Sequence, residues 1–315
     1  MRFQLIALRK DAYILKRYGN ILFGNRVGVN SLTVFVTKED GSRQVFDREK
    51  VVRTCLRMGV NRRIAFEVAD EVEARLYDGI PTRKVLQMIF RLLREHRPHI
   101  RHFLDLKKGL SLMNSKPEFE KFVQTLLAHH GFEVSPNQIL RGKCVGHEVD
   151  AIARKDGVTY FVEAKHHSNY HTPTGLDESR IARAVLEDVT EAFALGKSDL
   201  KIDMAMIVTN TRYSEHARRY GKCRNILQIG WSSPKTLGLQ NMIEEKELYP
   251  LSCIKGLNNE TKMKLVNSGI VLMKQLLEEK PAKLARETGI SLETLKRIIE
   301  KAKTSTYLLE KAKAD

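Results

Sequence analysis

The sequence predicts a multi-domain α/β protein whose centre is a mixed sheet with helices on both faces. Three observations indicate this class. The chain of 315 residues is long enough for two or three hydrophobic cores. Val149 to Lys165 alternates and then runs through β-branched and aromatic residues around an Asp156-Gly157 turn, which is typical of a β-hairpin. From Tyr249 onwards, apolar residues recur at helical spacing and are interrupted by glycines, so an all-helical end is expected.

The chain is strongly basic, and its charge is unevenly distributed. It carries 54 Lys and Arg against 38 Asp and Glu, a formal net charge of +16. Residues 1–110 hold 23 basic and 12 acidic residues, residues 111–250 hold 18 of each, and residues 251–315 hold 13 basic and 8 acidic residues. A polyanion is therefore the expected partner, attracted mainly by the two flanking regions. We predict that this partner is DNA.

The composition also bears on the compartment. No run of 18 apolar residues is present in the sequence, so no membrane-spanning helix is expected. Arg9-Lys10 and Lys16-Arg17 interrupt the apolar N-terminal stretch too early for a secretory signal. The four cysteines lie far apart without a C-x-x-C pair, which argues against a zinc ribbon and against disulfides. We predict a cytoplasmic protein without membrane contact, and the sequence leaves the oligomeric state open, a homo-oligomer included.

Residues 1–30 give no assignable pattern and are treated as an unassigned N-terminal segment. The elements predicted after them are a strand over Leu32–Thr37, a return strand over Arg43–Phe46, a helix capped by Asp47, a helix over Arg62–Tyr77 and a helix capped by Thr82. This part of the chain is therefore expected to be mostly helical, with one β-hairpin at its start.

The motif VTKEDGSRQVFDREKV, continued by ADEVEARLYDGIPTRKV, resembles the ATP-cone, the regulatory nucleotide-binding module of ribonucleotide reductases and of a related bacterial repressor. The resemblance implies an ATP-cone domain over residues 31–110 that binds ATP or dATP as an effector. The nucleotide contacts that it implies fall on Val36, Lys38, Gln44, Phe46, Asp47, Lys50 and Thr82. Lys38 and Lys50 suit phosphates as flexible charges, and Lys50 also lies in a first helical turn, whose free N–H groups favour anions. Glu39 departs from the family, which usually has Arg there.

The predicted central hairpin brings three charged residues together. Asp150 lies on its first strand, while Glu163 and Lys165 lie near the end of the second, two residues apart and hence on one face. Two carboxylates on a largely apolar hairpin are costly to bury without a compensating charge. A divalent metal ion would supply that charge and would recruit water for attack on a phosphodiester.

With Glu120 in PEFEKFVQTLLAHHGFEV, this arrangement resembles the catalytic core of the PD-(D/E)xK nuclease superfamily, in particular the Mrr-type restriction endonucleases. The resemblance implies a nuclease domain over residues 117–235, with a mixed α/β/α restriction endonuclease-like core and Mg²⁺ or Mn²⁺ as cofactor. The implied catalytic residues are Asp150, Glu163, Lys165 and Glu120, and the implied metal ligands are Asp150, Glu163 and the carbonyl of Ala164. Glu118 replaces Glu120 if the helix register differs. His166-His167 either contact phosphate or metal, or form a polar strand end.

The C-terminal part follows a predicted linker at Gly109–Pro117 and the nuclease segment. Its repeated Ile254-Lys255-Gly256-Leu257 and Glu287-Thr288-Gly289-Ile290 resemble a tandem helix-hairpin-helix domain. Each glycine permits a tight turn in which backbone N–H groups approach a phosphate. The resemblance implies an all-α helix-hairpin-helix domain over residues 249–304, which binds DNA without reading its sequence. The implied DNA contacts are Lys255, Gly256 and Gly289.

These modules predict a metal-dependent DNA endonuclease that hydrolyses phosphodiester bonds and is regulated by ATP or dATP at the cone. The alternative is a non-catalytic, nucleotide-sensing DNA-binding regulator, for which the ATP-cone repressors are the precedent. Those repressors use a cysteine-rich zinc ribbon, whereas the cysteines here lack that spacing. The sequence contains no G-x-x-x-x-G-K-[ST] loop, so the nucleotide is expected to act as an effector.

Overall fold

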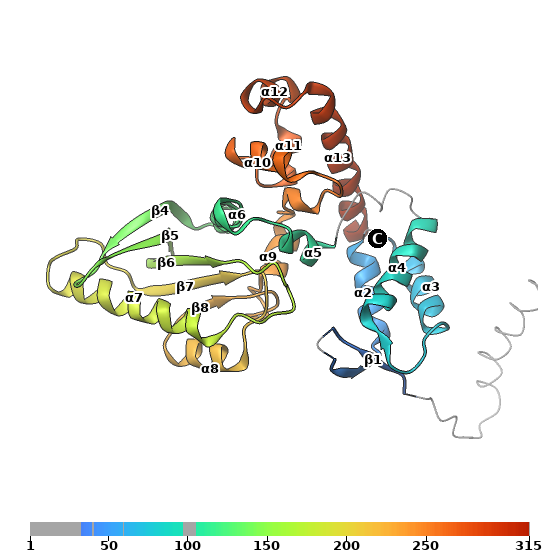
Figure 1. The fold of residues 1–315 in the computed structure, drawn as a ribbon, viewed down its shortest axis with the longest axis horizontal. Helices are drawn as coiled ribbons and strands as arrows, with labels where there is room; N and C mark the ends of the chain where they lie inside the picture. Colours follow the sequence, from blue (N-terminus) through green and yellow to red (C-terminus); the bar gives the residue numbers. More distant parts are fainter. Residues whose placement is uncertain (1–32, 40, 59, 97–104, 315) are drawn as a thin grey trace, which may run out of the picture.

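The computed structural model describes residues 33–39, 41–58, 60–96 and 105–314, so the unassigned segment 1–30 lies outside the described residues. Three parts follow one another along the chain in Figure 1: a small helical part with short strands, a central sheet with helices, and an all-helical C-terminal part. The predicted multi-domain α/β class is confirmed. No helix among the described residues is long and apolar enough to cross a membrane.

The first part is a three-stranded sheet packed against three helices. Its elements are β1 (Phe35–Thr37), β2 (Arg43–Val45), α2 (Arg48–Arg57), α3 (Arg62–Glu73), β3 (Ile80–Pro81) and α4 (Thr82–His96). The strands take the order β2-β1-β3, with β1 antiparallel to β2 and parallel to β3. Asp47 and Asn61 cap α2 and α3 by accepting backbone N–H groups with their side chains. The second helix ends at Glu73, before the predicted Tyr77.

The central part is a five-stranded mixed sheet of order β4-β5-β6-β7-β8. Its elements are α6 (Glu120–His129), β4 (Glu133–Arg141), β5 (Gly146–Lys155), β6 (Val158–Lys165), α7 (Leu176–Ala194), β7 (Met204–Thr209), α8 (Glu215–Cys223) and β8 (Leu227–Ile229). The first three strands are antiparallel, whereas β6, β7 and β8 run parallel. The β5–β6 turn has positive φ at Asp156 and Gly157, as a tight two-residue hairpin requires.

Helices cover both faces of this sheet, as predicted. Neighbouring residues of a strand point to opposite faces. Accordingly, Val162 lies in a hydrophobic core that contains α6 residues such as Phe122, and Phe161 lies in a second core with α7 residues such as Leu186. Figure 1 shows α7 and α8 on one side of the sheet and α6 on the other.

The C-terminal part consists of short helices and one long one. Its elements are α9 (Leu239–Lys246), η4 (Leu251–Cys253), α10 (Asn259–Asn267), α11 (Met273–Glu278), α12 (Pro281–Thr288) and α13 (Leu292–Ala314). Gly256 and Gly289 both have positive φ, 77° and 65°, at the two predicted turns. The first of these turns is preceded by a single 3₁₀ turn instead of a full helix.

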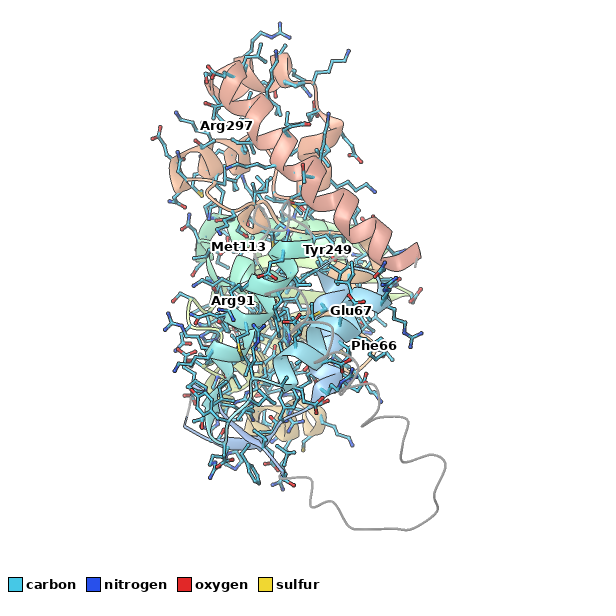
Figure 2. The ribbon with its side chains drawn as sticks, turned by 90° about the vertical axis from the view of Figure 1, so that its right-hand side faces the viewer. Phe66, Glu67, Arg91, Met113, Tyr249 and Arg297 are labelled. Carbon is cyan, nitrogen blue, oxygen red and sulfur yellow. The ribbon has the colours of Figure 1, made fainter. Side chains whose placement is uncertain are left out.

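The segment predicted as a linker, Gly109–Pro117, is part of the packed structure. It contains the end of α5 (Leu106–Ser111) and the start of the π-helical turn η3 (Ser115–Phe119). Leu110 and Met113 are buried, and a Cβ on Gly109 would collide with Cys253 of the C-terminal part. Figure 2 shows Met113 and Tyr249 where the C-terminal helices meet the rest of the protein. The prediction was wrong because the glycine and serine here serve close packing, not flexibility.

A buried ion pair fixes the C-terminal part to this segment. Lys262 Nζ on α10 lies 2.8 Å from Glu118 Oε2 in η3, and the two side chains are only 5% and 1% exposed. The ammonium also donates to the carbonyl of Leu112, and the Glu118 carboxylate accepts the N–H of Asn114. Because the two buried charges compensate each other, removal of one leaves the other buried and uncompensated.

We therefore expect Lys262→Met to destabilise the protein by about 3–5 kcal/mol. The measurement is the chemical unfolding transition, and the Glu118→Gln/Lys262→Met double variant should recover much of the loss. Lys264→Met, two residues further along α10, removes the exposed pair with Glu260 and should cost less than about 1 kcal/mol. Equal losses in Lys262→Met and Lys264→Met would show that the buried pair does not hold the two parts together.

Candidate active site

The candidate active site lies where β5 and β6 separate. Their pairing runs from Lys155–Val158 to Ala151–Val162 and stops there, while β6 continues beside β7 as far as Lys165. Beyond the last pair, the Asp150 carboxylate links the two strands by accepting the backbone N–H of Ala164 at 2.7 Å. A side chain therefore joins two strands that the backbone no longer joins, and this aims Asp150 at the end of β6.

Asp150 is also held from the opposite side. Gln124 on α6 donates to the Asp150 carbonyl at 2.8 Å. Val149 and Ala151 lie in different cores, although residues two apart on a regular strand share a face. The strand therefore changes orientation at Asp150, opposite Asn137, which has positive φ.

Glu120, at the start of α6, joins Asp150 in this site. Its carboxylate is nearly buried and lies 3.0 Å from Lys116 Nζ, and the same ammonium is 3.9 Å from Asp150 Oδ1. Burial raises the pKa of Glu120 above its ordinary value, while the hydrogen bond with Lys116 opposes that shift. The structure therefore brings Glu120 beside Asp150. Glu118, the alternative from the sequence, forms the buried ion pair with Lys262 instead.

Glu163 is the most perturbed carboxyl of the group. Burial, and then the negative charge of Asp150, raise its pKa from 4.5 to about 7, while Lys116 and Lys165 oppose the shift. Lys165 itself pairs with Glu178 near the start of α7, at 2.9 Å between Nζ and Oε1. The sequence did not indicate Glu178, Lys116 or Gln124, because their contacts depend on how α7, η3 and α6 dock on the sheet.

The donor chemistry of this group fits a divalent cation. Carboxylates of Asp150, Glu163 and Glu120 and the carbonyl of Ala164 are hard oxygen donors, which Mg²⁺ and Mn²⁺ prefer. The raised pKa of Glu163 reflects burial first and the negative charge of Asp150 second, and Lys116 and Lys165 offset these causes only in part. Within the described ranges, no three His, Cys, Asp or Glu side chains form a ready ligand set, and Lys116 bridges two of the carboxylates.

The two histidines after Lys165 turn away from the carboxylates. His166 contacts the carbonyl of Leu110 at 2.9 Å, and His167 contacts Thr174 Oγ1 at 3.1 Å. Burial lowers the pKa of both, which favours neutral rings. They line a cavity of about 420 Å³ together with Met113, Asn114, Ser115, Ser168, Asn169 and Thr172. The structure therefore places them as structural polar groups beside the site.

The residues expected to contact the nucleotide gather around the β2-β1-β3 sheet. Strand pairing sets Val36 opposite Gln44 on one side and opposite Ile80, two residues before Thr82, on the other. Phe46 packs partly buried against the core. Asp47 caps α2 through the Lys50 N–H, and the Lys50 side chain is exposed. The Lys38 backbone closes the β1–β2 turn by contacting Ser42 and Gly41.

This turn meets the central part directly. Glu39 Oε2 lies 2.7 Å from His171 Nε2. His171 lies in the loop that follows β6, the strand that carries Glu163 and Lys165. Lys107 lies over the rings of Tyr170 and Trp231, with its Nζ 5.4 and 5.5 Å from the ring centroids. The residue at which the chain departs from the ATP-cone pattern is thus a contact between two parts of the protein.

The residues expected to contact DNA are exposed at the two turns of the C-terminal part. Lys255 and Gly256 form the first turn, and Lys301 from α13 joins them by donating to the Lys255 carbonyl at 3.4 Å. At the second turn the Gly289 N–H closes the end of α12 by donating to Ala285. The Gly289 N–H is therefore already bonded within the protein. At this position a phosphate would meet the shape of the turn and not a free Gly289 N–H.

Comparison with known proteins places this fold and site in a class. Residues 112–229 match the family model described as Restriction endonuclease, residues 34–103 match the ATP cone domain, and residues 249–304 match AF1548-like, C-terminal. The chain therefore carries a restriction endonuclease-like domain between an ATP-cone domain and an AF1548-like C-terminal domain. This confirms the predicted three-module layout.

The relatives are archaeal. An uncharacterised protein of Archaeoglobus fulgidus is 35% identical over 178 residues, which cover 56% of this chain and 96% of the relative. The chain belongs to the family of that protein. A second uncharacterised A. fulgidus protein is 50% identical over 38 residues, 12% of this chain and 81% of the relative. The crystal structure of the protein of unknown function AF1548 superposes with a TM-score of 0.52 at 32% identity, covering 63% of this chain and 97% of that one.

The raised pKa of Glu163 predicts a pH-dependent stability in metal-free protein. The folded protein holds this proton more tightly than the unfolded chain, so stability falls as the pH rises from 4.5 to about 7, and the loss is complete above that range. Glu163→Gln should therefore stabilise the protein at pH 8 by roughly 1–3 kcal/mol, and the gain should shrink below about 1 kcal/mol at pH 5.

Chemical unfolding in EDTA at the two pH values measures this gain. Glu133→Gln on β4, whose side chain is 75% exposed, is the matched control and should show no comparable change. A gain for Glu163→Gln that is equal at pH 5 and pH 8 would contradict the electrostatic origin of the effect.

Proposed function

We propose that this protein is a metal-dependent DNA endonuclease whose activity responds to ATP or dATP. The observation that carries the proposal is the convergence of Asp150, Glu163 and Glu120 where β5 and β6 separate, with Lys165 beside them. Beside burial, the charge of Asp150 raises the pKa of both Glu163 and Glu120, so these neighbouring carboxylates are unfavourable for stability. They are expected where a cation and a phosphodiester are to be bound.

Each residue has a role that follows from its position. Asp150 and Glu163 would hold Mg²⁺ or Mn²⁺, with the carbonyl of Ala164 and with Glu120 as further oxygen donors. A cation held there would supply Lewis-acid chemistry, which favours attack of water on phosphorus and offsets developing negative charge. Lys165 stabilises negative charge on the phosphate, and its contact with Glu178 keeps the ammonium in place.

DNA is the proposed substrate because basic charge surrounds this neutral domain. The regions 1–110 and 251–315 both carry an excess of Lys and Arg. In the C-terminal part, proposed as a helix-hairpin-helix domain, the exposed turn with Lys255, Gly256 and Lys301 suits phosphate contacts that carry no sequence information. The cone is proposed to bind the adenine nucleotide, and the contact of Glu39 with His171 links that domain to the loop after β6.

Asp150→Asn should abolish DNA cleavage in the presence of Mg²⁺ or Mn²⁺ while leaving DNA binding nearly unchanged. The substitution keeps the shape of the side chain and removes only its charge. We expect a loss of at least about 100-fold in the cleavage rate, of the size found when a positioned charge is removed from an active site. The measurements are plasmid cleavage and a fluorescence binding titration, each at fixed salt because phosphate contacts are salt-dependent.

Asp203→Asn is the matched control for this experiment. Asp203 also accepts a backbone N–H of β6, from Thr159 at 2.9 Å. It pairs with Lys201, however, and lies outside the group formed by Asp150, Glu163 and Glu120. Its cleavage rate should equal that of the wild type. If Asp150→Asn cuts as fast as the wild type, the site is wrongly assigned; if the wild type binds DNA and never cuts it, the non-catalytic regulator is the better proposal.

Nucleotide binding at the cone should raise the melting temperature of the intact protein. A ligand at a hundredfold excess over its dissociation constant stabilises the folded state by about 2.7 kcal/mol. Lys38→Ala/Lys50→Ala should remove this increase because both phosphate-neutralising charges are lost. The control Arg63→Ala/Arg75→Ala also removes two charges, each from an exposed ion pair of the same domain, and should keep the increase. Absence of any shift with ATP or dATP in the wild type would refute the nucleotide assignment.

A further inference from the structure

Lys116 lies beside the candidate site and has no role in the proposed mechanism. It lies in η3, four residues before Glu120 and two before Glu118. The segment is fixed from below by the buried Glu118–Lys262 pair and by the hydrogen bond from the Asn114 N–H to Glu118. The Lys116 side chain, in contrast, is 71% exposed. An anchored segment thus presents a water-accessible ammonium to the carboxylates.

The Lys116 ammonium acts on three carboxylates at once. It lies 3.0 Å from Glu120 Oε1 and 3.9 Å from Asp150 Oδ1, and its charge also opposes the rise of the Glu163 pKa. The other lysine of the site, Lys165, is engaged by Glu178. Lys116 therefore supplies positive charge to the same oxygens that are proposed to hold the metal.

We propose that Lys116 is an exchangeable counter-ion, which binds the Glu120 and Asp150 carboxylates until a divalent cation displaces it. This inference rests on the proposed metal site. An ammonium and a metal ion cannot lie against the same oxygens because their like charges repel strongly at such distances. Displacement is easy for an exposed side chain, since the ammonium moves into water and keeps its hydration.

The exchange has a measurable consequence for metal affinity. The metal must compete with Lys116, so the apparent affinity of the site is lower than that of the same carboxylates without the lysine. Lys116 also lowers the repulsion among the carboxylates in the metal-free protein. Removing Lys116 should therefore destabilise the metal-free protein and, by comparison, favour the metal-bound protein.

The test is Mn²⁺ binding to the full-length protein, followed by electron paramagnetic resonance of the free ion and by calorimetry. Lys116→Met should bind Mn²⁺ roughly three- to thirtyfold more tightly than the wild type, which corresponds to the loss of one charge-assisted contact with a nearly buried carboxylate. Lys116→Arg keeps the competing charge and should stay within about threefold of the wild type. Lys116→Gln carries the same expectation as Lys116→Met and replaces it if that variant does not fold.

The matched control is Lys143→Met. Lys143 also forms an ion pair with a glutamate, Glu191, at the far end of α7, about 20 Å along the helix from Glu178. Its Mn²⁺ affinity should equal that of the wild type. Wild-type binding with no gain in Lys116→Met and Lys116→Gln would overturn the counter-ion and leave the nuclease proposal standing. No Mn²⁺ binding by the wild type or by any Lys116 variant would overturn both. If Lys116→Met and Lys116→Gln bind Mn²⁺ and the wild type does not, Lys116 competes strongly enough to prevent binding, which would support the proposed counter-ion role.

Discussion

The hydrogen bond from the Ala164 N–H to the Asp150 carboxylate is the interaction on which the site depends. It forms where the backbone pairing of β5 and β6 has ended, so it determines how far the two strands separate. Asp150 consequently faces the end of β6, where Glu163 and Lys165 lie. Helix α6 contributes Glu120 at its first residue, and its Gln124 donates a hydrogen bond to the Asp150 carbonyl. The cost of gathering these carboxylates is visible in the raised pKa of Glu163, and it is compensated in this state by Lys116.

The domains around this site are joined to the central part by polar contacts. The buried Glu118–Lys262 pair connects the C-terminal helices to the turn from which Glu120 and Lys116 extend. On the other side, Glu39 of the cone reaches His171 behind β6. The proposed DNA-binding part and the proposed nucleotide-binding part therefore each contact a segment that adjoins the site, η3 in one case and the loop after β6 in the other.

Much of this architecture could be predicted from local patterns. The two-residue period put Glu163 and Lys165 on one face, Asp156-Gly157 marked the hairpin turn, and Asp47 marked the start of α2. The sequence did not predict β4, because Pro136 and the positive φ of Asn137 interrupt its strand pattern. It did not indicate Lys116 or Glu178, and it named Glu120 with Glu118 as the alternative. The contacts of these residues depend on how η3 and α7 pack against the sheet and, for Glu118, on Lys262, a partner more than a hundred residues away.

The central claim is that the oxygens of Asp150 and Glu163 form a divalent metal site where β5 and β6 separate. Its most direct test is X-ray diffraction from crystals grown with Mn²⁺, measured near the manganese absorption edge. The account predicts an anomalous peak within about 2.5 Å of a carboxylate oxygen of each residue, with the Lys116 ammonium moved away from Asp150. A peak elsewhere, or none at this position while Lys116 still bridges Glu120 and Asp150, would contradict it.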